Sequence, residues 1–411
     1  MFVLRWHIML LGHEINKKRK GLTQCSKHNS TQKLSKPKLE TIPRCKRPSK
    51  FTIDPFVELS SSKFIETYGL RKESVKNLIE ELKAYIPNPR RSDGIQIHTK
   101  VLIALSFYVS GLYQKNLGEN VLHHTSQKTV SRSVTQVTDA LNCLQSKHIK
   151  WPDVVTERDC IKARFNEKFG LPGVVGCVDS MHVAIIKPHV QEEKYHNKEG
   201  YHSLNVMIIS DADLNILCVD PSNPGSLDDS AAWNNHLLCP LMNQIVESGE
   251  EAYLLGDSEY QLSKVLLTPV ANCTEGSSEH HYNLKHMTAH NSVKTCINIL
   301  KARFRCLLSG HPLHYDPVAA GKIVTACCIL HNIAVATDTP LPDQSLNDLK
   351  SDILLQQMEE TLIKPDISWK EIVGRDSMDQ DFLENQSQDS SDQRYDVQPQ
   401  QARHRLWENS E

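Results

Sequence analysis

An aspartate stands inside an apolar, β-branched run of the kind that forms a buried strand. The run reads VVGCVDSMHVAII over residues 174–186, and Asp179 divides it. Burying an unpaired carboxylate costs several kcal/mol or more, so the fold must supply a partner for this side chain. A metal ion, a basic side chain or contact with solvent would each meet that requirement.

Strand-like and helix-like segments alternate along this part of the chain. Strands are predicted at 173–180, 182–188, 204–210, 216–222 and 252–257. Helices are predicted at 228–238, 292–307 and 321–334. The first of these helices has acids in its first turn, where the helix dipole favours them. This order of elements predicts an α/β fold with a mixed sheet flanked by helices.

The preceding part of the chain has helical periodicity instead, with helices predicted at 72–86, 99–113 and 126–144. In the third helix Ser126 has the chemistry of an N-cap. The apolar face of that helix consists of Val130, Val134, Val137 and Leu141. Small polar residues gather in its first turn, as in the recognition helix of a helix-turn-helix. An amphipathic core helix of a bundle gives the same pattern, and the sequence leaves both interpretations open.

The two ends of the chain carry opposite charge. Residues 1–50 hold 13 Lys and Arg against two acids, whereas residues 341–411 hold seven against 16. A basic arm of this kind predicts a polyanionic partner or nuclear import, and an acidic segment rich in Gln, Ser and Asp predicts disorder. The twelve cysteines include no CxxC pair, which favours reduced thiols in an intracellular protein. No apolar stretch approaches the ~20 residues of a membrane span.

These patterns divide the chain into four parts. They are a disordered basic arm (1–50), an all-helical, helix-turn-helix-like region (51–160), an α/β domain (161–338) and an acidic, mostly disordered tail (339–411). Within the α/β domain, Asp179 and Asp257 each stand where a predicted strand runs out. Such positions converge at one edge of a sheet, where a divalent cation with oxygen ligands would relieve the repulsion between two carboxylates. Acids at strand ends are common in α/β proteins, so spacing alone does not specify the site.

Five motifs in a fixed order carry a resemblance to a known family. They are PGVVGCVDSMHVAIIKP, YHNKEGYHSLNVMIISDADLNILCVDPSNPGSLDDSAAW, LLGDSEYQLSKVLLTP, LKARFRCL and CCILHNIA. Over residues 51–335 the chain resembles the PIF/Harbinger superfamily of DDE transposases, and in particular the Harbinger transposase-derived nucleases, their domesticated relatives. The resemblance implies a ribonuclease-H-like DDE catalytic domain after a helical region, and two-metal phosphodiester chemistry with Mg²⁺ or Mn²⁺.

The resemblance also assigns the acids. Asp179 matches the first catalytic acid and Asp257 matches the acid of the GDSGY motif, while Asp229 matches the acid of PGSxxDS. Asp179 and Asp257 are therefore implied as catalytic, and all three aspartates as metal ligands. Glu259 replaces a glycine in GDSEY, so a different local turn is expected. Asp228 would either compete with Asp229 as a ligand or cap the following helix.

The third acid of the family pattern is missing. The family has a glutamate seven residues before the lysine of LKxRF, and this chain has Lys294 there. An ammonium group cannot bind a metal ion, and near the two catalytic aspartates it would pair with them instead. His290 replaces an arginine four residues earlier. Glu275 and Glu279 would supply the acid only through a rearrangement of the loop predicted around them.

Other titratable residues have simpler interpretations. A stretch predicted to be a polar loop contains His280, His281, His286 and His290. No CxxC or HExxH pattern accompanies these histidines, so a solvated loop is preferred to a zinc site. His182, in a DxxH pattern, is expected to orient its strand. Cys177 lacks a base partner and is expected to be a core thiol.

Three functions are consistent with these residues. The first is a divalent-metal-dependent nuclease that hydrolyses DNA phosphodiester bonds, weakened by Lys294. The second is a catalytically inactive, domesticated transposase that binds DNA or other proteins in the nucleus, and the third is a complete, active transposase. DNA is the expected partner, and the resemblance further implies a separate Myb-like DNA-binding protein. We expect a nuclear location, with the cytoplasm as a second compartment, and no membrane partner.

The basic arm generates a direct prediction. If residues 1–50 bind phosphates, each contact releases counterions, and deleting the arm should flatten the dependence of log K on log salt concentration. Electrophoretic mobility shifts or fluorescence anisotropy over a series of salt concentrations would measure the slope for both proteins. An unchanged slope would show that the arm does not contact the nucleic acid.

Overall fold

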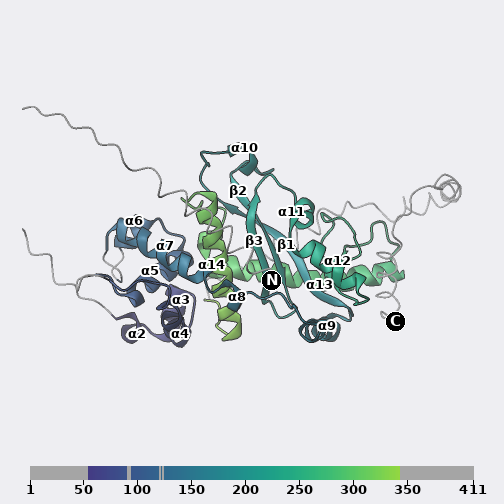
Figure 1. Cartoon of the computed structure of the whole chain (residues 1–411), viewed down its shortest axis with the longest axis horizontal. Helices are drawn as coiled ribbons and strands as arrows, with labels where there is room; N and C mark the ends of the chain where they lie inside the picture. The colour runs from purple at the N-terminus through teal and green to yellow at the C-terminus, as the bar shows by residue number, and fades with distance from the viewer. Residues whose placement is uncertain (1–53, 90–93, 120–121, 123–124, 343–411) are drawn as a thin grey trace, which may run out of the picture. The chain divides into compact units, whose positions relative to one another are not determined.

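A computed structural model describes residues 54–89, 94–119, 122 and 125–342 (Figure 1). The predicted basic arm lies outside these residues. So does the predicted acidic tail, apart from residues 339–342.

A five-stranded mixed sheet forms the centre of the α/β part, with strand order β3-β2-β1-β4-β5. The strands are β1 (Val174–Ala184), β2 (Ser203–Ser210), β3 (Ile216–Pro224), β4 (Tyr253–Leu255) and β5 (Leu266–Leu267). β1, β2 and β3 pair antiparallel, whereas β1 pairs with β4, and β4 with β5, in parallel. The predicted α/β class with a mixed sheet is confirmed.

The two strands predicted on either side of Asp179 are one continuous strand. β1 runs through Asp179 without a break and pairs with β2 from Cys177 to Ala184. The aspartate was taken as a strand end because its charge suggested an interruption of the apolar pattern. The ladder hydrogen bonds are made by backbone groups, so they continue past the charged side chain.

Helices cover both faces of the sheet (Figure 1). Cys177 and Met181 of β1 belong to a core that includes Val293 and Leu300 of α13 (Ser278–Arg303). Val178, which points to the opposite face, belongs to a second core. That core includes residues of α11 (Asp229–Asn235) and α12 (Leu238–Glu247). This alternation is the two-residue period of a strand that is buried on both sides.

The N-terminal part of the described chain is helical, as predicted. Its helices are α2 (Pro55–Glu58), α3 (Ser61–Tyr68), α4 (Lys72–Leu82), α5 (Ile97–Ser110), α6 (Gln114–Glu119), α7 (Gln127–Asn142), α8 (Gln145–His148) and α9 (Val155–Phe169). Ser126 caps α7 by accepting a hydrogen bond from the Thr129 amide at 3.3 Å. The four predicted apolar residues of α7 are fully buried. The first-turn residues Gln127 and Lys128 are exposed, and their role in reading DNA stays a prediction.

One helix corrects the expectation about apolar length. α14 (Pro317–Ala336) is long and apolar enough to cross a bilayer by length and composition, although 72% of its apolar window is buried within the fold. Figure 1 shows it between α7 and β3, both of which it contacts. Burial of this kind is typical of a core helix. Through α14 the helical region and the sheet share one hydrophobic core.

The C-terminal end of α13 is tied to two distant segments through Arg303. Its guanidinium donates to the carbonyl oxygens of Gly69 at 2.9 Å, Thr339 at 2.8 Å and Pro340 at 3.3 Å. Gly69 ends α3 in the left-handed conformation, and Thr339 and Pro340 follow α14. Burial lowers the pKa of Arg303 to about 10. Arg303 therefore connects the ends of three helices at a site that excludes water.

Replacing Arg303 with Ala should destabilise the protein by about 2–4 kcal/mol, because it leaves buried carbonyl groups without donors. Arg303→Lys should recover part of the loss, since an ammonium cannot span all three carbonyls. Equilibrium urea denaturation of the full chain would measure both changes. Arg164→Ala is the control: Arg164 is exposed and pairs with Asp213 and Glu167, so water replaces its bonds at little cost. Equal stability of the Arg303→Ala and Arg164→Ala variants would contradict the buried link.

Candidate active site

Strand pairing brings Asp179 and Asp257 together. In the parallel ladder of β1 and β4, Cys177 lies opposite Leu255. Asp179 lies two residues further along β1, and Asp257 lies two residues beyond Leu255, just past the end of β4. The two carboxyl groups lie close enough for the charge of Asp257 to act on the pKa of Asp179. Asp179 is two residues from Cys177 and two from Met181, so its side chain points to the same face of the sheet as theirs, which α13 covers. The predicted convergence of these two acids is present.

The pKa of the Asp179 carboxyl group is shifted by its position under α13 and near Asp257. Its pKa is raised from the usual value to about 7, mainly by burial and in second place by the charge of Asp257. The Ser180 amide, which donates to Oδ1 of Asp179 at 2.8 Å, and the charge of Lys294 act in the opposite direction. The Ser180 amide and Lys294 therefore do not fully offset the cost of ionising Asp179 at this site.

The turn after β4 holds Asp257 in place. The Glu259 amide donates to Oδ1 of Asp257 at 3.0 Å, and the Tyr260 amide donates to its carbonyl oxygen at 3.3 Å. Glu259 is not among the described residues with positive φ. The turn therefore does not need the glycine of the family motif, and the expected change of turn at Glu259 is not required by the backbone.

Asp229 is the first residue of α11, which packs on the face of the sheet opposite to the one that Asp179 points to. Its Oδ1 accepts a hydrogen bond from Asn205 Nδ2 at 2.7 Å. Asn205 pairs with His182 on the sheet face opposite to that of Asp179. Asp228, next to it, caps α11 by accepting from the Ala231 amide at 2.7 Å. Of the two open interpretations of Asp228, this geometry is that of the helix cap.

Tyr260 is a member of the site that the sequence analysis did not identify. Its side chain is 4% exposed, and its hydroxyl lies 3.4 Å from Ser180 Oγ. Burial and the charges of Asp229, Asp179 and Asp257 together raise the pKa of this hydroxyl well above its usual value. The phenol therefore lies within reach of all three acids. The signal was available, since Tyr260 ends the GDSEY motif that contains Asp257.

Helix α13 packs on β1, β2 and β4, and two of its histidines hydrogen-bond to strand carbonyls. His290 Nε2 hydrogen-bonds to the Val178 carbonyl at 3.0 Å, and His286 Nε2 to the Leu267 carbonyl at 3.2 Å. Lys294 follows His290 by one helical turn. Its charge acts on the pKa values of both Asp179 and His290. The predicted approach of Lys294 to the acidic centre is therefore present.

The segment predicted as a polar loop is in fact the first half of α13, which begins at Ser278. Ser277 caps it by accepting from the His280 amide at 3.2 Å, and that cap starts the helix about 14 residues earlier than predicted. Glu279 precedes Lys294 by 15 residues, or about 22 Å of helix, and cannot take the place of the third acid. Glu275 lies still further away along the chain, before the helix.

The remaining candidates have structural roles. His182 Nδ1 bonds to Ser203 Oγ at 3.0 Å, and Asn197 donates to the same oxygen at 3.0 Å, so His182 orients the chain beside β1. Cys177 donates to the Ala289 carbonyl at 3.4 Å, and burial raises the pKa of its thiol to about 12. This thiol stays protonated and is a core group rather than a nucleophile.

The metal centre implied by the resemblance fits this site only in part. Among the residues that the structure describes, no group of three or more His, Cys, Asp or Glu could hold a metal ion. Asp179, Asp229 and Asp257, the three predicted ligands, do not form such a group among the described residues, and their role as metal ligands stays a prediction. Asp179 and Asp257, whose charges raise one another's need for a cation, fit a single divalent ion with water completing its shell.

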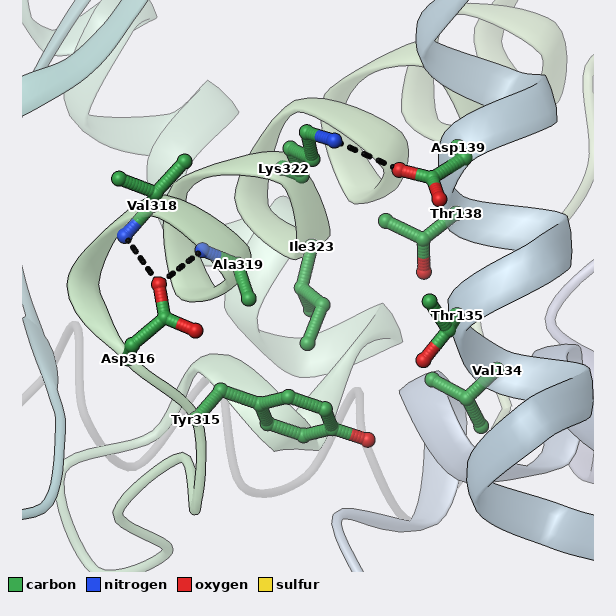
Figure 2. Close-up of a pocket in the computed structure, with 10 residues that line it drawn as sticks. All are labelled: Val134, Thr135, Thr138, Asp139, Tyr315, Asp316, Val318, Ala319, Lys322 and Ile323. Carbon is green, nitrogen blue, oxygen red and sulfur yellow. Dashed lines mark hydrogen bonds and ion pairs between the residues drawn. The ribbon is translucent and has the colours of Figure 1, made fainter. Parts of the chain in front are cut away.

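A second recess lies away from the aspartates, between α7 and the start of α14 (Figure 2). Lys322 Nζ bonds to Asp139 Oδ1 at 2.7 Å across it, and Asp316 accepts from the amides of Val318 and Ala319 at 3.1 Å. Figure 2 shows Lys322 and Asp139 turned toward one another, and Asp316 turned toward the backbone amides at the start of α14. Since they satisfy each other, this recess joins two helices and does not present a binding site.

The pKa of Asp179 generates a prediction about stability. Its folded-state pKa of about 7 lies above the usual value near 4, so the folded protein holds this proton more tightly than the unfolded chain. The resulting stability is complete below about pH 4 and is lost as the pH rises to about 7. Asp179→Asn removes the cost of ionisation and should raise the free energy of unfolding by about 1–3 kcal/mol at about pH 8 in EDTA.

Urea denaturation at about pH 5 and about pH 8 would measure this difference, which should be larger at the higher pH. Asp213→Asn is the control, because Asp213 forms exposed ion pairs with Arg164 and Lys168 that lower its pKa. This variant should lose stability rather than gain it. If Asp179→Asn were no more stable than the natural protein at the higher pH, the burial of this carboxyl group would be disproved.

Comparison with known proteins agrees with the geometry. Residues 178–332 match the family described as DDE superfamily endonuclease. The chain is 35% identical over 290 residues to the human (Homo sapiens) protein named "Putative nuclease HARBI1", which covers 69% of this chain and 81% of that protein. The Xenopus laevis protein of the same name is 34% identical over 298 residues, covering 72% and 84%. "Protein ALP1-like" of Arabidopsis thaliana is 26% identical over 267 residues, covering 62% and 63%. No solved structure matches the chain.

Proposed function

The chain belongs to the Harbinger-derived DDE family, with its ribonuclease-H-like catalytic domain, and we propose that it is a metal-dependent nuclease acting on DNA. The observation that carries the proposal is the parallel pairing of β1 with β4, which ends two residues before Asp179 and Asp257 and brings their charges within reach of one another. The half-buried Asp179 carboxyl group has a pKa raised first by burial and then by the charge of Asp257. Perturbed acids of this kind are typical of catalytic centres.

In the proposed reaction Asp179 and Asp257 hold one Mg²⁺ or Mn²⁺. When bound, such an ion supplies Lewis-acid stabilisation of the charge that develops on the phosphodiester. The chain itself fixes the two carboxylates: the Ser180 and Glu259 amides donate to their Oδ1 atoms at 2.8 and 3.0 Å. Fixed ligands reduce the reorganisation that the centre undergoes during the reaction.

Two further groups orient the surroundings of this centre. Asn205 holds Asp229 and the Leu227 carbonyl, which sets the start of α11 beside the sheet. The buried Tyr260 hydroxyl stays protonated and so serves as a hydrogen-bond donor near the three acids. Both groups are positioning residues in this proposal, since neither needs to contact the scissile phosphate.

Lys294 supports a second candidate function. Its charge already offsets part of the negative charge at Asp179. If Lys294 lowers the affinity of the acids for a metal ion, catalysis is weakened. If no ion binds, the protein is a catalytically inactive, domesticated transposase that binds DNA or other proteins in the nucleus. The basic arm and the exposed start of α7 would supply contacts to phosphates in either case. A Myb-like DNA-binding protein is the partner we propose, by the resemblance described above.

A nicking assay distinguishes the two functions. Purified full-length protein would be incubated with supercoiled plasmid and Mg²⁺ or Mn²⁺, and the relaxed form measured over time. We expect slow nicking that Asp179→Ala and Asp257→Ala each reduce at least about 100-fold, because each removes half of the ion's protein ligands. Asp213→Asn should retain the activity of the natural protein. Absence of nicking with both metals would favour the inactive, DNA-binding function.

A further inference from the structure

We propose that the Lys294 ammonium group serves as a resident cation of the active site and binds a non-bridging oxygen of the DNA phosphodiester. This inference rests on the proposed function, because it takes the site to be the place where a DNA strand lies. It adds that the site needs at most one divalent ion, and that it contacts DNA without any. The ligand it assigns is a phosphodiester.

The placement of Lys294 is determined by helix and sheet together. His286 and His290, on successive turns of α13, hydrogen-bond to the carbonyls of Leu267 in β5 and Val178 in β1. These bonds fix the rotation and the height of α13 above the strands. Lys294 lies one turn after His290, and its charge reaches the Asp179 carboxyl group next to Val178. Lys294 is half-buried there.

Binding of a DNA phosphodiester beside Asp179 and Asp257 requires a positive charge such as that of Lys294. Two carboxylates and a phosphodiester are three negative groups, and bringing them together in a poorly hydrated site is unfavourable without positive charge. A glutamate ligand together with the divalent ion that it holds has a net charge of +1. One lysine has the same charge. The substitution at position 294 therefore keeps the net charge of the site while it removes one metal ion and its ligand.

The chemistry of the ammonium group suits a phosphate oxygen. It has three donors and no acceptor, so it cannot bind a metal ion but can donate to anionic oxygens. Lysine binds phosphate as a compact charge on a flexible stem, which tolerates movement of the bound strand. The charge of Lys294 already acts on Asp179 in the structure without DNA, so the ammonium group lies beside the acidic centre before DNA arrives.

A second lysine extends the cationic face of α13. Lys301 follows Lys294 by seven residues, two turns and about 10 Å along the same side of the helix. Burial lowers the pKa of Lys301, while the charges of Asp179 and Glu199 act to raise it. His290, one turn before Lys294, has its pKa lowered by burial. The positive charge of this face thus lies from Lys294 onward, toward the end of α13.

The test measures binding rather than turnover. Affinity of the full chain for a fluorescent DNA duplex would be measured by anisotropy in EDTA over a series of salt concentrations. Lys294→Met should weaken binding about 5- to 10-fold at physiological salt and reduce the salt slope by about one, because one phosphate contact is lost. Lys294→Arg should restore the slope. Lys285→Met, at a half-buried lysine on the same helix, should leave the slope unchanged.

The slope makes the test independent of other DNA contacts, since the basic arm contributes equally in every variant. A salt slope for Lys294→Met equal to that of the natural protein would overturn the inference. So would two Mn²⁺ ions bound per natural chain in calorimetric titration, where we expect at most one, and one more in Lys294→Glu. A protein that nicks DNA with an unaffected slope disproves only this inference. A protein that never nicks but loses the slope with Lys294→Met disproves only the nuclease.

Discussion

The parallel pairing of β1 with β4 imposes the central constraint on this protein. It brings the carboxyl groups of Asp179 and Asp257 close together, and the half-buried Asp179 is incompletely hydrated there. Every other feature of the site is a response to that charge. Two backbone amides bond to the carboxylates, a tyrosine hydroxyl lies among the acids, and the helix above them carries a lysine. In the function proposed above, the same repulsion would favour binding of a cation.

Helix α13 carries most of what distinguishes this chain from the family pattern. Where the family has a cation followed one turn later by an acid, this helix has a buried histidine followed by a lysine. The histidine became part of the packing, because its Nε2 satisfies a strand carbonyl. The positive charge moved one turn closer to the aspartates. The two departures thus lie one turn apart on the same helix, one bonded to β1 and the other acting by its charge on Asp179.

Much of the sheet and the approach of Asp179 to Asp257 could be predicted from the sequence, because apolar runs and the acids at their ends are local patterns. The course of β1 through Asp179 could not, since a ladder of backbone bonds ignores a charged side chain. The early start of α13 depends on one serine cap and on strand carbonyls that are distant in the sequence. Arg303 and Tyr260 matter through partners far along the chain, which no local pattern reveals. The hydrogen bond between Asn205 and Asp229 joins residues that are 24 positions apart, so it too could not be predicted.

The position of α14 has a consequence for how this protein is made. This helix is the last element of the shared core along the chain, yet it fills the space between α7 and β3. A ribosome synthesises both of its neighbours well before it. Until α14 is synthesised, the apolar surfaces of α7 and β3 that it buries are exposed. The 20-residue apolar segment that then emerges has the length and composition of a membrane span as well as those of a core helix. Productive folding therefore depends on what shields these surfaces in the seconds before the final helix arrives.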